Sequence, residues 1–315
     1  MDKPVVRAAV IQAAPVLFDT VATLSKLEDL VREAADQKAD IAVFPEAFVG
    51  GYPKGLDFGA RLGTRSAEGR DAFRRYFQSA IAVPGPECAR IGEIARNFGI
   101  HLVVGIIERD GATLYCTALM YGPDGRLLGK HRKLVPTALE RIVWGQGDGS
   151  TLAVVDSDIG KIGSVICWEN YMPLLRMAMY AQGIEIYCAP TVDDRDTWLP
   201  TMRTIALEGR CFVVSASQYL TREDCPPEYS ELLQSEPPAV LIRGGSCIVD
   251  PLGNVLLAPE FGASSVRVAE LDRRKITRGK YDLDIVGHYA RPAVLTLNVN
   301  TSAQASVTFS PIPAI

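Results

Sequence analysis

The sequence predicts an α/β fold with a layered sheet. Short apolar segments rich in β-branched residues alternate along the chain with longer segments in which apolar residues recur at helical spacing. Strands and helices of these lengths in alternation are typical of a sheet covered by helices. Two hairpin signals, GPDG at 122–125 and DPLGN at 250–254, each separate two apolar strands. Their corresponding places in the chain favour an internally duplicated α/β unit.

The N-terminal part is predicted to form a strand, a helix and a second strand. Val5–Ala13, a β-branched and alanine-rich run, is the expected first strand. Asp19 or Thr20 can cap the helix that follows. The second buried strand, Ile41–Phe44, must end at Pro45, because proline cannot donate to a sheet ladder. The apolar residues at helical spacing are Val21, Leu24, Leu27, Val31 and Ala34.

The rest of the chain continues the alternation after the glycine-rich segment AFVGGYPKG, which we expect to form a pocket wall. No shift in composition marks a linker, so we expect one domain over residues 1–298. Residues 299–315 are expected to be a tail that is extended, disordered or at a subunit interface, and Thr221–Pro238 an exposed insertion. The expected elements are the helices Ser66–Ala80 and Glu87–Phe98, the strands His101–Ile107 and Thr113–Tyr121, a strand through LLGKHRKLV that stops at Pro136, the strand Ile162–Ile166, the helix Pro173–Gln182, the strand Ile184–Ala189, the helix Trp198–Gly209 and the strand Phe212–Ser217.

Composition excludes several classes of protein. A chain of 315 residues that is 48% hydrophobic can bury a large core. No apolar run approaches the roughly 18 residues that a membrane span needs, and the N-terminus lacks the layout of a secretion signal. The net charge of −4, without a basic cluster, argues against nucleic acid as a partner. Seven cysteines without a CxxC pair and three scattered histidines predict no disulfide framework, no metal site and a reducing cytoplasm.

Three reactive side chains each follow an apolar strand. Glu46, Lys133 and Cys167 would converge on one rim of a sheet whose adjacent strands run in the same direction. A thiolate can attack an electrophilic carbon, a carboxylate can relay its proton and activate water, and an ammonium can stabilise developing negative charge. Cys167 lies at the start of a predicted helix, where a thiol near solvent tends toward thiolate. Each residue also has a non-catalytic interpretation. Cys167 could be a buried structural cysteine, Glu46 a solvated turn residue and Lys133 a surface charge.

Other polar residues near this constellation have structural interpretations. His131 would point to the same face as Lys133 and offers a Cys–His alternative, but a hydrogen-bonded structural role is favoured. Asp148 and the pair Asp193–Asp194 are expected to be loop and helix-capping residues.

The residues around the three reactive groups resemble three motifs of the nitrilase superfamily. They are FPEAFVGGYP around Glu46, HRKLVPT around Lys133 and CWENYMPL around Cys167, in the family's order and at similar spacing. The resemblance extends from Val5 to about Asn298. It implies a four-layer α-β-β-α sandwich with these three residues as the catalytic trio. It also implies that Glu140, in TALERIVWGQGDGS, is a further active-site glutamate that positions Lys133 or a substrate amine.

The residues after the cysteine resemble the true nitrilase branch. Trp168-Glu169-Asn170 follows Cys167, where the amidase and carbamoylase branches usually have Tyr-Asp or similar. SAEGRDAFRRYFQSAIAVPGPE is similar to plant and bacterial nitrilases acting on aryl or arylalkyl nitriles. One departure is Ala293 in HYARPAV, where relatives often show an acidic residue.

The resemblance implies a cofactor-free enzyme that converts an organic nitrile and two waters to a carboxylic acid and ammonia, with an amide as a minor product. The alternatives are an amidase or cyanide dihydratase using the same site and, in a different class, an inactive filament-forming scaffold. A homo-oligomer, a dimer or a larger spiral, is also implied. The candidates for lining the substrate pocket, for which plain core packing is the alternative, are Tyr52, Trp144, Trp168, Thr191 and Val192.

Overall fold

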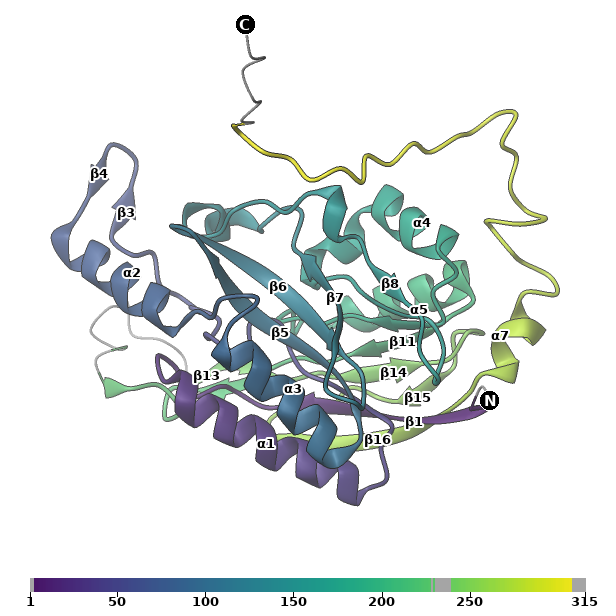
Figure 1. Cartoon of the computed structure of the whole chain (residues 1–315), viewed down its shortest axis with the longest axis horizontal. Coiled ribbons are helices and arrows are strands. Elements are labelled where there is room, and N and C mark those ends of the chain that lie inside the picture. The colour runs from purple at the N-terminus through teal and green to yellow at the C-terminus, as the bar shows by residue number, and fades with distance from the viewer. Residues whose placement is uncertain (1–2, 228, 230–238, 308–315) are drawn as a thin grey trace, which may run out of the picture.

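The computed structural model describes residues 3–227, 229 and 239–307 (Figure 1). Most of the expected insertion at Thr221–Pro238 and the last part of the expected tail, residues 308–315, lie outside the described residues. Among those described, no helix is long and apolar enough to cross a membrane.

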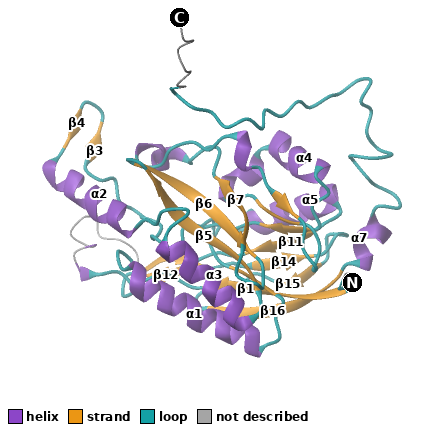
Figure 2. Ribbon diagram, in the orientation of Figure 1, coloured by secondary structure: helices purple, strands orange, loops and turns teal. Residues whose placement is uncertain are grey.

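Two six-stranded sheets form the centre of the molecule (Figure 2). In spatial order the strands of the first sheet are β16 (Ser265–Asp272), β1 (Val5–Gln12), β2 (Ile41–Val43), β5 (His101–Asp110), β6 (Thr113–Tyr121) and β7 (Leu127–Arg132). Those of the second sheet are β15 (Val255–Leu257), β14 (Cys247–Val249), β11 (Phe212–Ser215), β10 (Ile186–Cys188), β9 (Ile162–Ser164) and β8 (Val154–Val155). Two small ribbons pair β3 (Ala60–Arg61) with β4 (Thr64–Arg65) and β12 (Tyr219–Thr221) with β13 (Val240–Arg243).

The two sheets share one pattern of strand directions. In the first, β1, β2 and β5 run parallel, and β6 and β7 then return as antiparallel strands. In the second, β9, β10 and β11 run parallel and are followed by antiparallel β14 and β15. An antiparallel edge strand, β16 or β8, completes each sheet. This repeated topology agrees with the duplicated unit that the hairpin signals predicted.

Helices cover the outer face of each sheet, and the inner faces pack together. The strands alternate their side chains accordingly: in β2, Ala42 faces the helices α1 and α3, whereas Ile41 and Val43 face the second sheet. On the second sheet, Val213 packs toward α4 and α5. The result is the four-layer α-β-β-α sandwich. The helices are α1 (Thr20–Asp36), α2 (Ala67–Ser79), α3 (Pro86–Phe98), α4 (Pro173–Ala181), α5 (Trp198–Gly209) and α7 (Arg274–Gly279), with 3-10 turns η1 (Ala138–Ile142), η2 (Gly149–Thr151) and η3 (Cys167–Tyr171).

The predicted helices and strands are present with small shifts at their ends. Asp19 caps α1 by accepting a hydrogen bond from Ala22 N at 2.9 Å, and Asp148 caps η2. The prediction missed β16, although its sequence SVRVAELD has partial strand alternation. It also missed α7. After Gly279 the described chain contains no further helix or strand and runs as a long extended segment (Figure 1).

Candidate active site

Glu46 is held in a buried turn behind β2. Pro45 ends the strand as expected, and Glu46 is fully buried. The next residue, Ala47, has a φ of 52°, a conformation that costs a non-glycine residue free energy and marks a constrained turn. The main-chain oxygen of Glu46 accepts a hydrogen bond from Gln218 Nε2 at 2.8 Å. The backbone that carries the Glu46 carboxylate is therefore held by the turn and by Gln218.

Lys133 follows β7 directly and points at two carboxylates. Its Nζ donates to Glu46 Oε1 at 2.6 Å and to Glu140 Oε2 at 2.8 Å. The same ammonium lies 5.5 Å from the centre of the Trp144 ring. Its main-chain N–H donates to Cys116 O at 2.8 Å, which continues the β6–β7 pairing by one residue. Lys133 is thus a buried cation whose main chain is held by the strand pairing and whose ammonium is held by the carboxylates of Glu46 and Glu140.

Cys167 occupies a sharp turn between β9 and η3. Its φ is 51°, in the left-handed region that favours glycine. Its main-chain N–H donates to Pro190 O at 2.8 Å, and its Sγ accepts a hydrogen bond from the Thr191 hydroxyl at 3.2 Å. Asn170 donates from Nδ2 to Cys167 O at 2.8 Å. These contacts hold a strained turn that presents the sulfur to Glu46 and Lys133.

The three residues meet across the two sheets, which corrects the predicted single rim. Glu46 and Lys133 follow strands of the first sheet, and Cys167 follows a strand of the second. Within the first sheet, β2 and β7 are separated by two other strands. The convergence arises because the sheets pack face to face and their strand ends meet at one end of the sandwich.

Burial and charge together set the protonation of the site. Burial raises the pKa of the Cys167 thiol, Glu46 raises it further, and Lys133 opposes them without restoring the usual value. The expected exposed thiolate is therefore wrong, because Cys167 is only 3% exposed and its surroundings favour the thiol. Burial also raises the pKa of Glu46, against the opposing influence of Lys133. For Lys133, burial is outweighed by Glu46, Cys167 and other groups, so its pKa lies well above the usual range.

Glu140 connects this buried site to a cavity of about 420 Å³. Its Oε1 accepts from the Tyr52 hydroxyl at 2.8 Å, while Oε2 accepts from Lys133 and from Thr137 N. The cavity is lined mainly by apolar and aromatic side chains, and the AFVGGYPKG segment contributes part of its wall as predicted. Lining residues include Tyr52, Leu56, Phe58, Leu139, Ile142 and Trp168.

The other predicted pocket residues lie behind this surface. Trp144 packs edge-on against Tyr52, with ring centres 5.7 Å apart, and donates its indole N–H to Tyr76. Thr191 is fully buried beside Cys167, and Val192 is buried in the same apolar cluster. These three are not among the residues that line the cavity.

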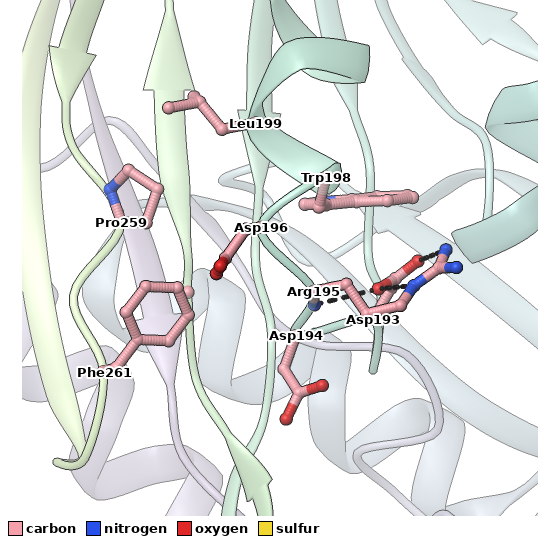
Figure 3. A pocket seen from close by; sticks show the side chains of 9 residues that line it. Asp193, Asp194, Arg195, Asp196, Trp198, Leu199, Pro259 and Phe261 are labelled. Carbon is pink, nitrogen blue, oxygen red and sulfur yellow. Dashed lines mark hydrogen bonds and ion pairs between the residues drawn. The ribbon is translucent and has the colours of Figure 1, made fainter.

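Asp193 and Asp194 lie in a loop, as one part of the prediction stated, but they do not cap a helix, because α5 begins beyond them at Trp198. Asp193 accepts a hydrogen bond from the Trp168 indole at 2.9 Å. It also accepts one from Arg195 Nε at 2.8 Å (Figure 3). The Arg195 guanidinium also stacks on the Trp168 ring, 4.7 Å from its centre. Asp193 and Arg195 therefore fix the indole that follows the cysteine, beside a surface hollow of about 270 Å³.

Several residues of the site were not found from the sequence. Cys116 places its Sγ 3.5 Å from Glu46 Oε1, and Gln218 holds the Glu46 main chain. The sequence indicates Glu169 only as part of a motif, yet Glu169 binds His131, which confirms the hydrogen-bonded role predicted for that histidine. Each of these contacts joins residues far apart in the chain, so local patterns carry no signal for them. Among the described residues, no group of three His, Cys, Asp or Glu side chains could hold a metal ion.

A buried thiol with a paired carboxylate and ammonium, on an α-β-β-α sandwich, defines the class of thiol-dependent enzymes that attack electrophilic carbon. The model of the carbon-nitrogen hydrolase family matches residues 7–281. The chain belongs to this family.

Similarity to individual proteins places the chain within the nitrilase branch. It is 56% identical over 301 residues to an aliphatic nitrilase of Sinorhizobium fredii, covering 96% of this chain and 97% of the relative. It is 53% identical to the bifunctional nitrilase/nitrile hydratase NIT4A of Lupinus angustifolius, covering 98% and 90% of the two chains. Nitrilase 2 of Arabidopsis thaliana is 51% identical, over 97% and 91%.

Solved structures share the fold at low identity. The C. elegans NitFhit protein superposes with a TM-score of 0.73 at 21% identity, covering 97% of this chain and 70% of that chain. Saccharomyces cerevisiae Nit3 gives 0.69 at 20% identity, covering 91% and 97%. Both have the architecture described above.

Proposed function

We propose that this chain hydrolyses an organic nitrile to a carboxylic acid and ammonia, with Cys167 as nucleophile, Glu46 as proton relay and Lys133 as charge stabiliser. The observation that supports it best is the contact of Lys133 Nζ with Glu46 Oε1 at 2.6 Å beside a buried thiol. Relatives at 51–56% identity that are named nitrilases support the nitrile as substrate.

The reaction begins with attack of the Cys167 sulfur on the nitrile carbon. Glu46 takes the thiol proton and delivers it to the nitrile nitrogen, which yields a thioimidate. Glu46 then takes a proton from water as the water oxygen adds to the same carbon. Glu46 passes this proton to the nitrogen, and Lys133 stabilises the tetrahedral species. The proton of the newly added hydroxyl then moves to the same nitrogen, so that the C–N bond breaks, ammonia leaves and the carbonyl of a thioester forms. A second water, again deprotonated by Glu46, releases the acid and restores the thiol.

We assign Glu140 a positioning role, and its side chain also faces the substrate cavity. It orients Lys133 and accepts a hydrogen bond from the Tyr52 hydroxyl. The aromatic and apolar walls suit an aryl, arylalkyl or aliphatic group, with Tyr52 and Trp168 as contacts. Trp144 would support Tyr52 from behind, and Thr191 and Val192 would contact the reacting carbon from the Cys167 side. The proposal requires no cofactor.

Product analysis tests the reaction directly. Ammonia, acid and amide would be measured from phenylacetonitrile, butyronitrile, phenylacetamide and cyanide in parallel. We expect acid and ammonia from an organic nitrile, and none from the Cys167→Ala variant. Turnover of only the amide or only cyanide would favour the neighbouring chemistries, and no turnover of any organic nitrile would overturn the proposal.

An amide by-product is a second activity supported by the relatives named bifunctional nitrilase/nitrile hydratase. If the tetrahedral species expels the thiolate before ammonia, the product is the amide. The ratio of amide to acid in the same assay measures this partition.

We also propose a homo-oligomer, a dimer or larger spiral, in a reducing compartment such as the cytoplasm. The extended segment after Gly279 exposes large apolar side chains, including Tyr281, Val294 and Leu295. With α4 it borders a mainly apolar hollow of about 390 Å³, and exposed apolar surface of this kind is typical of an interface. All seven cysteines are free thiols, which suits a reducing compartment. Light scattering of the full chain and of a chain ending at Lys280 would test the assembly, and a monomeric full chain would contradict it.

A further inference from the structure

A buried ion pair that has no part in the proposed reaction connects the two sides of the active site. His131 lies on β7, two residues before Lys133, and Glu169 lies in η3, two residues after Cys167. Both side chains are fully buried, and His131 Nε2 lies 2.9 Å from Glu169 Oε2. The pair therefore bridges the segment that carries the ammonium and the segment that carries the thiol.

The Glu169 carboxylate also binds the main chain on both sides. Oε1 accepts from Leu134 N at 2.6 Å, and Oε2 accepts from Ile166 N at 3.0 Å. Leu134 is the residue next to Lys133, and Ile166 is the residue next to Cys167. One carboxylate thus holds the backbone immediately beside each of the two groups, although these follow strands of different sheets.

His131 holds this carboxylate in place through its ring nitrogen. Its Nδ1 lies 3.2 Å from Thr151 O, so that both ring nitrogens face an acceptor. Both nitrogens can donate only when the ring is an imidazolium. Glu169 is the titratable group that faces the ring, and its charge raises the pKa of His131 against the effect of burial. The histidine thus supplies the counterion that a buried carboxylate requires.

The opposite face of β7 provides a matched comparison. His131 and Lys133 alternate with Lys130 and Arg132, which point to the other side of the strand. Glu108 there is also a buried carboxylate, and it binds Lys130 at 2.6 Å and Arg132 at 2.7 Å. Glu108 resembles Glu169 in burial and in charge pairing, but it does not bind the main chain next to Lys133 or Cys167.

We propose that Glu169 and His131 are positioning residues for the reaction, which set the separation of Lys133 from Cys167 by tying their two backbone segments to one carboxylate. The inference rests on the proposed roles of Lys133 and Cys167. Neither Glu169 nor His131 contacts the substrate cavity, so their effect is expected on the rate of the chemical steps rather than on substrate binding.

The experiment compares Glu169→Gln with Glu108→Gln in the full-length protein. Glutamine at 169 keeps the size but offers one carbonyl oxygen, so it cannot accept all the hydrogen bonds of the carboxylate. We expect kcat for a nitrile to fall about 100-fold, since a small misplacement of reacting groups has an effect of this order, with KM changed less than about threefold. Both variants lose stability, and activities are compared at a temperature where circular dichroism shows both to be folded. Glu108→Gln is expected to retain kcat within about threefold.

A second pair of variants separates positioning from simple packing. Both variants remove the positive charge, but His131→Gln retains an N–H that can donate to Glu169, whereas His131→Leu leaves the carboxylate without a donor at position 131. We expect the glutamine variant to lose less kcat than the leucine variant. In the double variant Glu169→Gln/His131→Gln, the loss of kcat should be smaller than the two single losses combined, because both substitutions break the same contact between His131 and Glu169.

The rate at which iodoacetamide alkylates Cys167, read by peptide mass spectrometry, tests the inference independently of nitrile turnover. We expect this rate to fall in Glu169→Gln and not in Glu108→Gln. Equal losses of kcat and of alkylation in the two variants would overturn the positioning role. An unmodified protein that turns over no organic nitrile would overturn the proposed function, while the alkylation comparison would still decide whether the pair positions the thiol.

Discussion

At Cys167, burial and the proposed role as nucleophile place opposite demands on one thiol. Desolvation raises its pKa and keeps it protonated, whereas attack on carbon needs the thiolate. In the proposed mechanism Glu46 resolves the conflict, because it is also buried and its own pKa is raised, so it can accept the proton at the moment of attack. Lys133 keeps the pair from carrying a net negative charge. The reactivity therefore belongs to the three residues together.

We predict that Glu46→Gln slows alkylation of Cys167 by iodoacetamide at neutral pH by at least about tenfold, since general-base assistance typically contributes 10²–10⁴-fold. Quenched samples analysed by peptide mass spectrometry give the rate for each cysteine. Cys225 is the internal control, because it is half-buried and unconnected to the trio, and its rate should not change. An unchanged Cys167 rate would show that Glu46 does not accept the thiol proton.

His131 gives the stability of the chain a defined pH dependence. Its pKa is raised in the folded state, so the folded protein binds the ring proton more tightly than the unfolded chain does. The resulting stability is fully present below the unfolded pKa of about 6.5 and is lost as pH rises through the folded pKa. It is worth about 1.4 kcal/mol for each unit by which the pKa is raised.

We therefore predict that the difference in free energy of unfolding between the unmodified protein and His131→Gln is largest near pH 6 and shrinks at alkaline pH. Urea unfolding at a series of pH values measures it. A His288→Gln variant, which changes an exposed histidine, serves as the control and should show no such trend. A difference that grows with pH would contradict the imidazolium assignment.

At the scale of elements, one buried carboxylate fastens three strands of the first sheet. Glu108 on β5 accepts from Thr117 on β6 at 2.9 Å and from both Lys130 and Arg132 on β7. Because β7 is the edge strand that carries Lys133 at its end, this cluster stabilises the strand from the face opposite the site. Removing one partner of a buried ion pair leaves the others uncompensated.

We predict that Glu108→Gln lowers the free energy of unfolding by about 3–5 kcal/mol. Asp110→Asn is the matched control: it removes an exposed carboxylate that pairs with the same Arg132, and it should cost about 1 kcal/mol or less. Urea unfolding monitored by tryptophan fluorescence compares them. Equal losses in the two variants would show that burial does not decide the strength of this cluster.

The sequence predicts the elements well where one pattern governs them. Periodicity locates α1 and β2, and Pro45 sets the strand end before Glu46, because these are local constraints. It fails at β16, where charged residues lie on both faces of the strand, Arg267 on the face of Leu271 and Glu270 on the face of Val266. It also fails at Asp193, where a side chain typical of a helix cap instead binds an indole and a guanidinium. In both cases the structure depends on a tertiary contact: β16 pairs with β1, and Asp193 binds Trp168.

At the scale of the whole molecule, the sequence indicates which residues react but not how they meet. Glu46, Lys133 and Cys167 are each recognisable as the polar residue after an apolar strand. Their distribution over two sheets depends on which strands pair, and pairing between distant segments leaves no local pattern. The burial that raises the pKa of Cys167 has the same origin, since strands of the first sheet and their loops pack against a turn of the second sheet that appears solvent-exposed when considered alone.

Because the trio spans both sheets, we expect the apolar layer between the sheets to set the geometry of the proposed reaction. Ile186 on β10 is fully buried in this layer, whereas Leu27 on α1 is equally buried between a helix and the outer face of the first sheet. We predict that Ile186→Ala and Leu27→Ala each lower the free energy of unfolding by about 2–5 kcal/mol. Only Ile186→Ala should also lower kcat, by about tenfold or more, because a cavity between the sheets lets Cys167 shift relative to Glu46 and Lys133.

Urea unfolding and steady-state kinetics on the same preparations test this prediction, at a temperature where both variants are folded. Normalising kcat to the fraction of Cys167 that iodoacetamide can label removes the contribution of inactive protein. Equal kcat values for the two variants would contradict the role of the intersheet layer, and the distance between the thiol and its partners would then be set by the loops at the strand ends, independently of how the sheets pack.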